Sequence, residues 1–155
     1  MDFVFAGWRV ATAEPGLVSM SDCVVDVAEE TLYSDRAQAE RVRAETPGTH
    51  VFAVGFHRDD VPAPRLAEPM PAGDVLGCEL VGMDPDMSCW HTWRCLGGLV
   101  EDVRAATDVV PGPHGLIQDV EQARRAAQWL TASGLGDPKV FDWVAALLVR
   151  PRPEA

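Results

Sequence analysis

The sequence has almost no lysine and no long apolar run. Lys139 is the only lysine among 13 basic residues, and this usage, with abundant Ala, Val, Gly and Pro, indicates a GC-rich bacterial genome. No stretch approaches the about 18 consecutive apolar residues that a membrane-spanning helix needs. Asp2 follows Met1 where a secretory signal would carry a positive charge. We therefore expect a cytoplasmic protein with no membrane contact.

Sequence motifs for metals and phosphates are also missing. The chain has no Cys-x2-4-Cys pair of the kind that structural zinc sites use, and Gly97-Gly98 stand without the other residues of a phosphate-binding loop. We therefore expect no metal and no cofactor. A chain this long needs no disulfide framework, so its cysteines are expected to be free thiols in a reducing compartment. They are Cys23, Cys78, Cys89 and Cys95.

Positive charge is scarce as a whole. The net charge is −11, from 24 acidic and 13 basic residues. Six acids and no base lie between Val10 and Asp35, and five acids and no base between Leu66 and Trp93. Such a surface repels phosphate backbones and anionic headgroups, which excludes nucleic acids and membranes as partners. A basic protein, bound by a monomer or dimer of this chain, is the complementary partner, although a plain role in solubility is the commoner reason for such a surface.

The pattern of apolar residues predicts an α+β fold, with one mainly antiparallel sheet of about four to five strands packed against three to four helices. Strands are predicted at 3–10, at 49–56 in the centre of the sheet, and at 74–83 and 88–95 as a hairpin around Asp84-Pro85-Asp86-Met87. Residues 23–27 fit a strand or the start of a helix. Residues 1–150 are expected to form a single domain without internal repeats, and 151–155 a frayed tail.

Helices are predicted from their capping residues and apolar spacing. Ser34 is expected to cap a helix to about Glu45, and Asp119 with Gln122 forms a capping-box pattern for a helix ending at Gly134. Another helix is predicted from about Leu96 to Thr107. The last is predicted over 138–149, where the continuous apolar character also fits a strand.

The most reactive segment is Ser88–Cys95, which holds two thiols, an imidazole and two indoles. On a strand, Cys89, His91, Trp93 and Cys95 would share one face. Cys89, His91 and Cys95 could bind zinc together with Cys78, but the spacing is poor and inert buried thiols are commoner. A thiolate paired with a histidine would instead be a nucleophile. An enzyme would therefore use Cys89, His91 and Cys95.

The hairpin also carries the residues expected to bind a partner. Glu79, Asp84 and Asp86 supply negative charge, and Trp90 and Trp93 are candidate interface anchors because aromatic side chains often dominate binding. Trp90 and Trp93 point to opposite faces of one strand, so only one of them can be fully buried.

Residues 73–130 resemble a known group of proteins. The run Gly73–Asp84, then Ser88-Cys89-Trp90-His91 and the Gly115-Leu116-Ile117 turn, is similar to small uncharacterised actinobacterial proteins, some of which resemble immunity proteins of bacterial polymorphic toxin systems. The resemblance implies a stoichiometric, non-catalytic inhibitor that occludes the active site of a cognate toxin. The alternative is a small cysteine- and histidine-dependent enzyme of a bacterial biosynthetic pathway.

Overall fold

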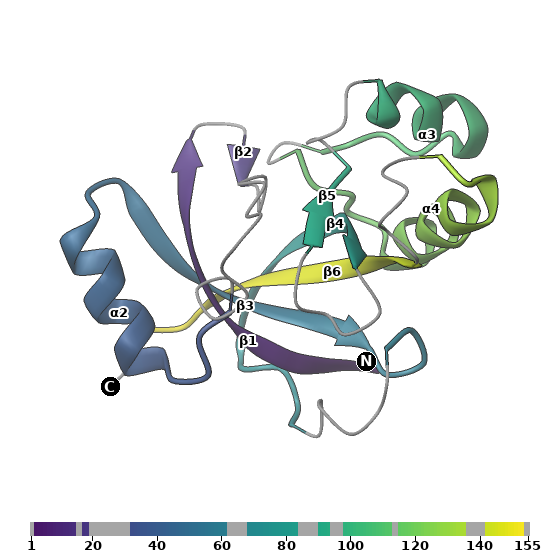
Figure 1. Ribbon diagram of the computed structural model, residues 1–155. Helices are drawn as coiled ribbons and strands as arrows, with labels where there is room; N and C mark the ends of the chain where they lie inside the picture. The colour runs from purple at the N-terminus through teal and green to yellow at the C-terminus, as the bar shows by residue number, and fades with distance from the viewer. Residues whose placement is uncertain are drawn as a thin grey trace.

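The computed structural model covers the whole chain and describes residues 2–14, 17–18, 32–61, 68–83, 90–93, 98–112, 115–135 and 142–153. It has an antiparallel sheet of four long strands with a short strand at each edge, in the order β2-β1-β3-β6-β4-β5 (Figure 1). The strands are β1 (Phe3–Glu14), β2 (Leu17–Val18), β3 (Thr49–His57), β4 (Gly73–Met83), β5 (Trp90–Thr92) and β6 (Asp142–Pro151). The described helices are α2 (Arg36–Glu45), α3 (Leu99–Thr107) and α4 (Val120–Ser133).

The predicted α+β class and most predicted strands are confirmed. β3 lies inside the sheet between β1 and β6, as its strong β-propensity indicated. β4 and β5 form the predicted hairpin, with Val81 opposite Thr92. The hairpin connection 84–89 and the segment 23–27 lie outside the described residues. Among the helices that the structure describes, none is long and apolar enough to cross a membrane.

Of the two alternatives for 138–149, the helix is wrong and the strand is confirmed for the described part, because residues 142–151 form strand β6. This strand pairs with β3 on one side and β4 on the other, and its residues 143–149 are all buried. A strand covered on both faces is apolar throughout, so periodicity alone does not distinguish it from a buried helix. Ordered backbone continues past 150, where the Arg152 N–H donates to Ala72 O at 3.2 Å.

The helix ends follow local capping chemistry. α4 begins as predicted, with the Asp119 carboxylate accepting from the Gln122 N–H at 3.0 Å. α2 is capped by Asp35 and not by Ser34, since the Asp35 carboxylate accepts from the Ala37 N–H. α3 begins after Gly98, which has φ +80°, and ends at Thr107 as expected.

The two halves of the chain repeat one construction, so the expectation of no internal repeat is wrong. In β1 a bulge at Gly7 precedes Trp8, which exchanges two backbone hydrogen bonds of 2.8 Å with Tyr33. In β4 a bulge at Gly77 precedes Cys78, which exchanges the same two bonds, also 2.8 Å, with Ile117. Two residues after each bridge an aspartate caps a helix, and each helix leads into a central strand.

The repeat is visible in sequence at the helix starts. Leu32–Arg41 reads LYSDRAQAER and Leu116–Arg125 reads LIQDVEQARR, identical at five positions. The strand register has the matching symmetry, because Ala53 pairs with Val149 and Gly55 with Leu147 on either side of the Val54–Leu148 pair. An approximate two-fold axis through that pair exchanges β1 with β4, β3 with β6 and α2 with α4.

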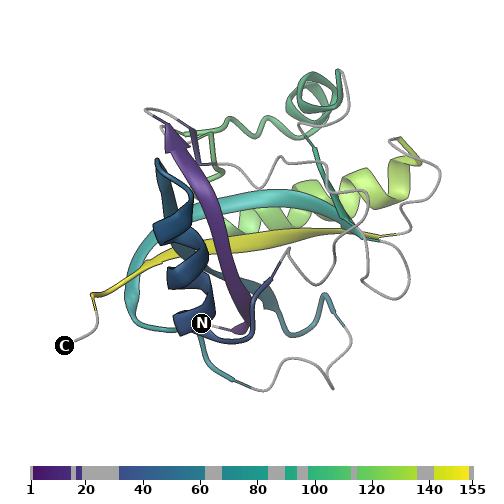
Figure 2. The same ribbon diagram turned by 60° about the vertical axis from the view of Figure 1, so that its left-hand side comes forward.

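The helices lie on one face of this sheet. Ala39 of α2 and Ala123 of α4 belong to one core cluster with inward-facing residues of the strands, and α3 packs against α4 in the same layer (Figure 2). A second cluster occupies the opposite face, where Phe52, Val54 and Phe56 are fully buried. No described helix covers that second face.

Candidate functional site

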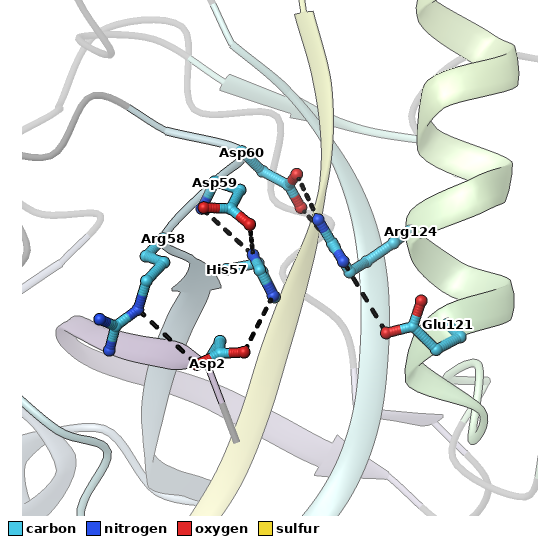
Figure 3. Close-up of polar contacts among 7 residues, drawn as sticks. All are labelled: Asp2, His57, Arg58, Asp59, Asp60, Glu121 and Arg124. Atoms are coloured by element: carbon cyan, nitrogen blue, oxygen red, sulfur yellow. Dashed lines mark hydrogen bonds and ion pairs between the residues drawn. The ribbon is translucent and has the colours of Figure 1, made fainter.

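Four strands begin or end together at one end of the sheet, and three of them, β1, β3 and β6, have charged residues there. Antiparallel neighbours alternate in direction, so β1 and β6 start where β3 and β4 end. α4 adds two charged side chains from its first turns, Glu121 and Arg124. We call this surface the acidic sheet end. Its residues are Asp2, His57, Arg58, Asp59, Asp60, Glu121, Arg124 and Asp142, and Figure 3 shows all of them except Asp142.

The Arg124–Asp60 pair joins α4 to the end of β3. The guanidinium donates from Nε and from one terminal nitrogen to the two carboxylate oxygens, each at 2.9 Å, and both side chains are only 16% exposed (Figure 3). Glu121 lies 3.8 Å from the same guanidinium. The hydrogen bonds to Asp60 raise the pKa of Arg124. A bidentate pair of this kind fixes the geometry as well as the charge.

His57 lies between two carboxylates. Its Nδ1 accepts a hydrogen bond from the Asp59 N–H at 3.1 Å, so a neutral ring carries its proton on Nε2, which faces the Asp2 carboxylate at 3.9 Å. The Asp59 carboxylate is 3.7 Å from Nδ1. The ring is nearly buried and meets Phe3 edge to face at 5.5 Å. His57 therefore holds the start of β1 against the end of β3.

Negative charge exceeds positive charge at the acidic sheet end. The carboxylates of Asp2, Asp59 and Glu121 are 70%, 75% and 71% exposed. The positive charges, by contrast, already face carboxylates: Arg124 is paired with Asp60, and Arg58 Nε lies 3.9 Å from Asp2. With Asp142 the surface has five carboxylates against two guanidinium groups. Carboxylates of this surface therefore face solvent.

A cleft of about 350 Å³ opens beside the Arg124–Asp60 pair. One wall is a stripe of α4 and the other is the start of β6. It is lined by Asp60, Arg124, Ala127, Gln128, Thr131, Ala132, Asp142, Trp143 and Val144. The Thr131 hydroxyl ties the two walls together, since it accepts from the Trp143 N–H at 2.8 Å and donates to the Trp143 carbonyl at 3.4 Å.

Two of the predicted interface residues cannot contact a partner in this fold. Glu79 and Trp93 are both 0% exposed, so the expectation that Glu79 contacts a partner is wrong, and of the two candidate tryptophans Trp93 is fully buried. The bulge at Gly77 sets the direction of the β4 side chains, and Glu79 consequently points to the second face of an inner strand, opposite Ala146. Trp93 packs in the core cluster beneath the helices, and its buried indole nitrogen has no hydrogen-bond partner among the described residues.

The other predicted residues of the hairpin are only partly described. Asp84, Asp86, Cys89 and Cys95 lie outside the described residues. Trp90 and His91 have a described backbone in β5, but their side chains are not described. Met83 pairs with both Trp90 and Asp142, so this backbone reaches the acidic sheet end.

The one described cysteine is chemically quiet. Burial and, to a lesser extent, the nearby Asp119 carboxylate raise the pKa of Cys78 from 9.0 to about 12. A neutral thiol is neither a nucleophile nor a metal ligand at physiological pH. The described part of the chain contains no group of three or more His, Cys, Asp or Glu residues placed to hold a metal ion.

Sequence reasoning missed most of the acidic sheet end. The run His57-Arg58-Asp59-Asp60 directly follows the strongest predicted strand, and its consecutive acids were a usable signal. Asp142 could not be placed, because it begins the strand that was predicted as a helix. The pairing of Arg124 with a residue 64 positions away is a tertiary contact without a local signal.

Comparison of the chain with protein-family models, with curated proteins and with solved structures gives no match. The functional inference therefore depends on the chemistry of the acidic sheet end.

Proposed function

We propose that this chain is a non-catalytic domain that binds a basic protein through its acidic sheet end. The observation that supports this is the excess of exposed carboxylates where four strands end, at a place where both arginines already face carboxylates. Opposed charge raises the rate of encounter and selects against acidic partners. The fixed geometry around His57 and Arg124 would limit the ordering that binding requires.

The specific form we propose is an immunity protein that covers the active site of a cognate toxin. Its support is the net charge of −11, which suits a basic nuclease or deaminase, and the resemblance of residues 73–130 to small uncharacterised actinobacterial proteins, some of which resemble such inhibitors. In this form Trp90, which pairs with Met83 at this end of the sheet, would extend the interface, together with Asp84 and Asp86, which follow Met83 in the sequence.

A charge-reversal experiment tests the interface. The variant Asp59→Lys plus Glu121→Lys reverses two carboxylates of the acidic sheet end. Glu45→Lys plus Asp74→Lys makes the same change in net charge at the opposite end of the sheet, where both residues are exposed. Isotope-labelled protein is titrated with an oligolysine peptide at low salt, and amide shifts are followed by NMR.

We expect the shifts to concentrate at residues 57–60 and 119–124, and the first variant to weaken binding by about tenfold or more, equivalent to about 1.4 kcal/mol. The control variant should change it by less than about twofold. Equal weakening by both variants would mean that only overall charge matters. The same three proteins can be used as baits in a lysate of the source cells. A true partner should bind the wild type and the control variant and should not bind the first variant.

A further inference from the structure

We infer that the cleft between α4 and β6 receives one basic side chain of the partner protein, most favourably an arginine. The inference rests on the proposed function and assigns the centre of its interface. It is carried by the shape of the cleft, by its charge balance and by a comparison of the two halves of the chain.

The size and lining of the cleft suit one long side chain. Its volume of about 350 Å³ lies at the lower end of the range of about 300–1,000 Å³ for small-ligand pockets. Ala127 and Ala132 provide aliphatic contacts for a methylene stem, while polar groups lie around it. Arginine and lysine bury their stems in this way and keep the charged group at a polar edge.

Of the two carboxylates that line the cleft, only one is neutralised by a cation among the described residues. Asp60 is neutralised by the two hydrogen bonds from Arg124. Asp142 also lines the cleft, yet among the described residues no hydrogen bond or ion pair of its carboxylate is found, and the same holds for the Gln128 amide. One cation therefore completes the site. A guanidinium can donate two parallel hydrogen bonds to a carboxylate such as that of Asp142, because its donors form a planar fork.

The walls of the cleft are fixed before a partner arrives. Thr131 bonds both backbone groups of Trp143, and the Trp143 and Ala127 side chains are buried. The Arg124–Asp60 pair closes one end of the cleft in the same rigid way. A preformed cleft requires little ordering of its side chains when the partner binds, and this is typical of the pockets that hold hot-spot residues.

The other half of the chain has a different set of residues at the equivalent positions. The approximate two-fold axis places Glu40 where α4 has Arg124, Ala44 where it has Gln128, and Gly48 where β6 has Asp142. The fold is the same in both halves, so it does not require Gln128 or Asp142 at these positions. A polar lining that the fold does not need is expected where a ligand is recognised.

A double-mutant cycle tests the inference. The probes are two capped peptides, Lys-Ser-Arg-Ser-Lys and the same peptide with citrulline, the neutral isostere of arginine, at its centre. Each is titrated against wild type and Asp142→Asn, and the control cycle uses Glu121→Gln, which removes a nearby carboxylate outside the cleft. NMR reports the Gln128 side-chain amide and the Trp143 indole N–H, and circular dichroism confirms that the variants are folded.

We expect wild type to prefer arginine over citrulline by about tenfold, Asp142→Asn to lose most of that preference and Glu121→Gln to keep it. The Gln128 and Trp143 signals should shift only with the arginine peptide. If the peptide binds at the acidic sheet end and Asp142→Asn keeps the preference for arginine, the cleft does not receive the arginine side chain. The proposed function would then still hold. Absence of any binding there would overturn both. Equal binding of free arginine would identify a small-molecule site instead and overturn the docking of a protein side chain.

Discussion

At the scale of single residues, the strongest polar contact of the acidic sheet end is the Arg124–Asp60 pair. Both partners are mostly buried and the two hydrogen bonds are of near-ideal length. Removal of one partner leaves the other charge partly desolvated without compensation. We expect this contact to contribute more than an exposed ion pair, which typically contributes less than about 1 kcal/mol.

Asp60→Ala and Arg124→Ala should each lower the free energy of unfolding by about 2 kcal/mol, and the double variant by clearly less than the sum. Urea denaturation of the four proteins gives the coupling energy. Arg125→Ala, at the exposed neighbouring position, is the control and should stay within about 0.5 kcal/mol of wild type. A coupling energy near zero would show that the contact between the two side chains does not stabilise the fold.

Cys78 should resist modification as long as the protein is folded. Its pKa of about 12 leaves almost no thiolate at neutral pH, and burial blocks access to the sulfur. We expect iodoacetamide to leave the peptide that contains Cys78 unmodified in native protein and to label it fully after denaturation, as measured by mass spectrometry. Because the folded-state pKa is raised, stability should fall as the pH rises from 9.0 towards 12. Rapid native labelling would contradict the assignment of Cys78 to the core.

At the scale of elements, the two N-caps offer a matched pair. Asp35 and Asp119 each accept a backbone N–H of the first turn, and each is followed by a buried alanine four residues on, Ala39 and Ala123. Asp35→Ala and Asp119→Ala should each lower the free energy of unfolding by about 1 kcal/mol, while the serine variants retain most of it. Thermal and urea unfolding measure both. If Ser34→Ala cost as much as Asp35→Ala, the structural cap of α2 would be misassigned.

Local chemistry explains which elements could be predicted from the sequence. The Asp119 cap, the αL residue Gly134 at the end of α4 and the hairpin of β4 and β5 depend on residues close together in the chain. β6 could not be distinguished from a buried helix in the sequence, because its seven buried residues form a strand only when β3 and β4 flank them. The burial of Glu79 depends on a bulge two residues earlier, and a bulge reverses which face each later side chain occupies.

At the scale of the whole molecule, a comparison of the two halves distinguishes the residues that both halves keep, which the shared fold requires, from those at which the halves differ. The halves have in common the bulge glycine, the bridge after it, the leucine, the capping aspartate and the buried alanine of the helix. They differ at Arg9 and Glu79, which occupy equivalent buried positions two residues after the bulges, and at the residues that line the cleft. The two halves could have been compared from the sequence alone. Five identities in ten residues are too few to show a repeat, however, without the symmetric pairing of β3 and β6 that the structure adds.

The bulge glycines provide the most direct test of this repeat. Gly7 and Gly77 have φ of +155° and +134°, and a Cβ at either position would lie 2.8 Å from the Cβ of Leu32 or Leu116. An added methyl group therefore meets both backbone strain and a close neighbour, each of which costs about 1–3 kcal/mol. We expect Gly7→Ala and Gly77→Ala to lower the free energy of unfolding by similar amounts, about 3 kcal/mol each.

Gly48→Ala is the control, because Gly48 has φ +80° but nothing within 4 Å of the added atom. It should cost only the strain of the left-handed conformation, about 1 kcal/mol. Urea denaturation of the three variants ranks them. Equal losses at Gly7 and Gly77, well above that at Gly48, are expected if both halves depend on the same close approach of the bridging segment to its strand. A large loss at one bulge with a small loss at the other would mean that only one half needs the bridge, and the structural equivalence of the halves would then not extend to their energetics.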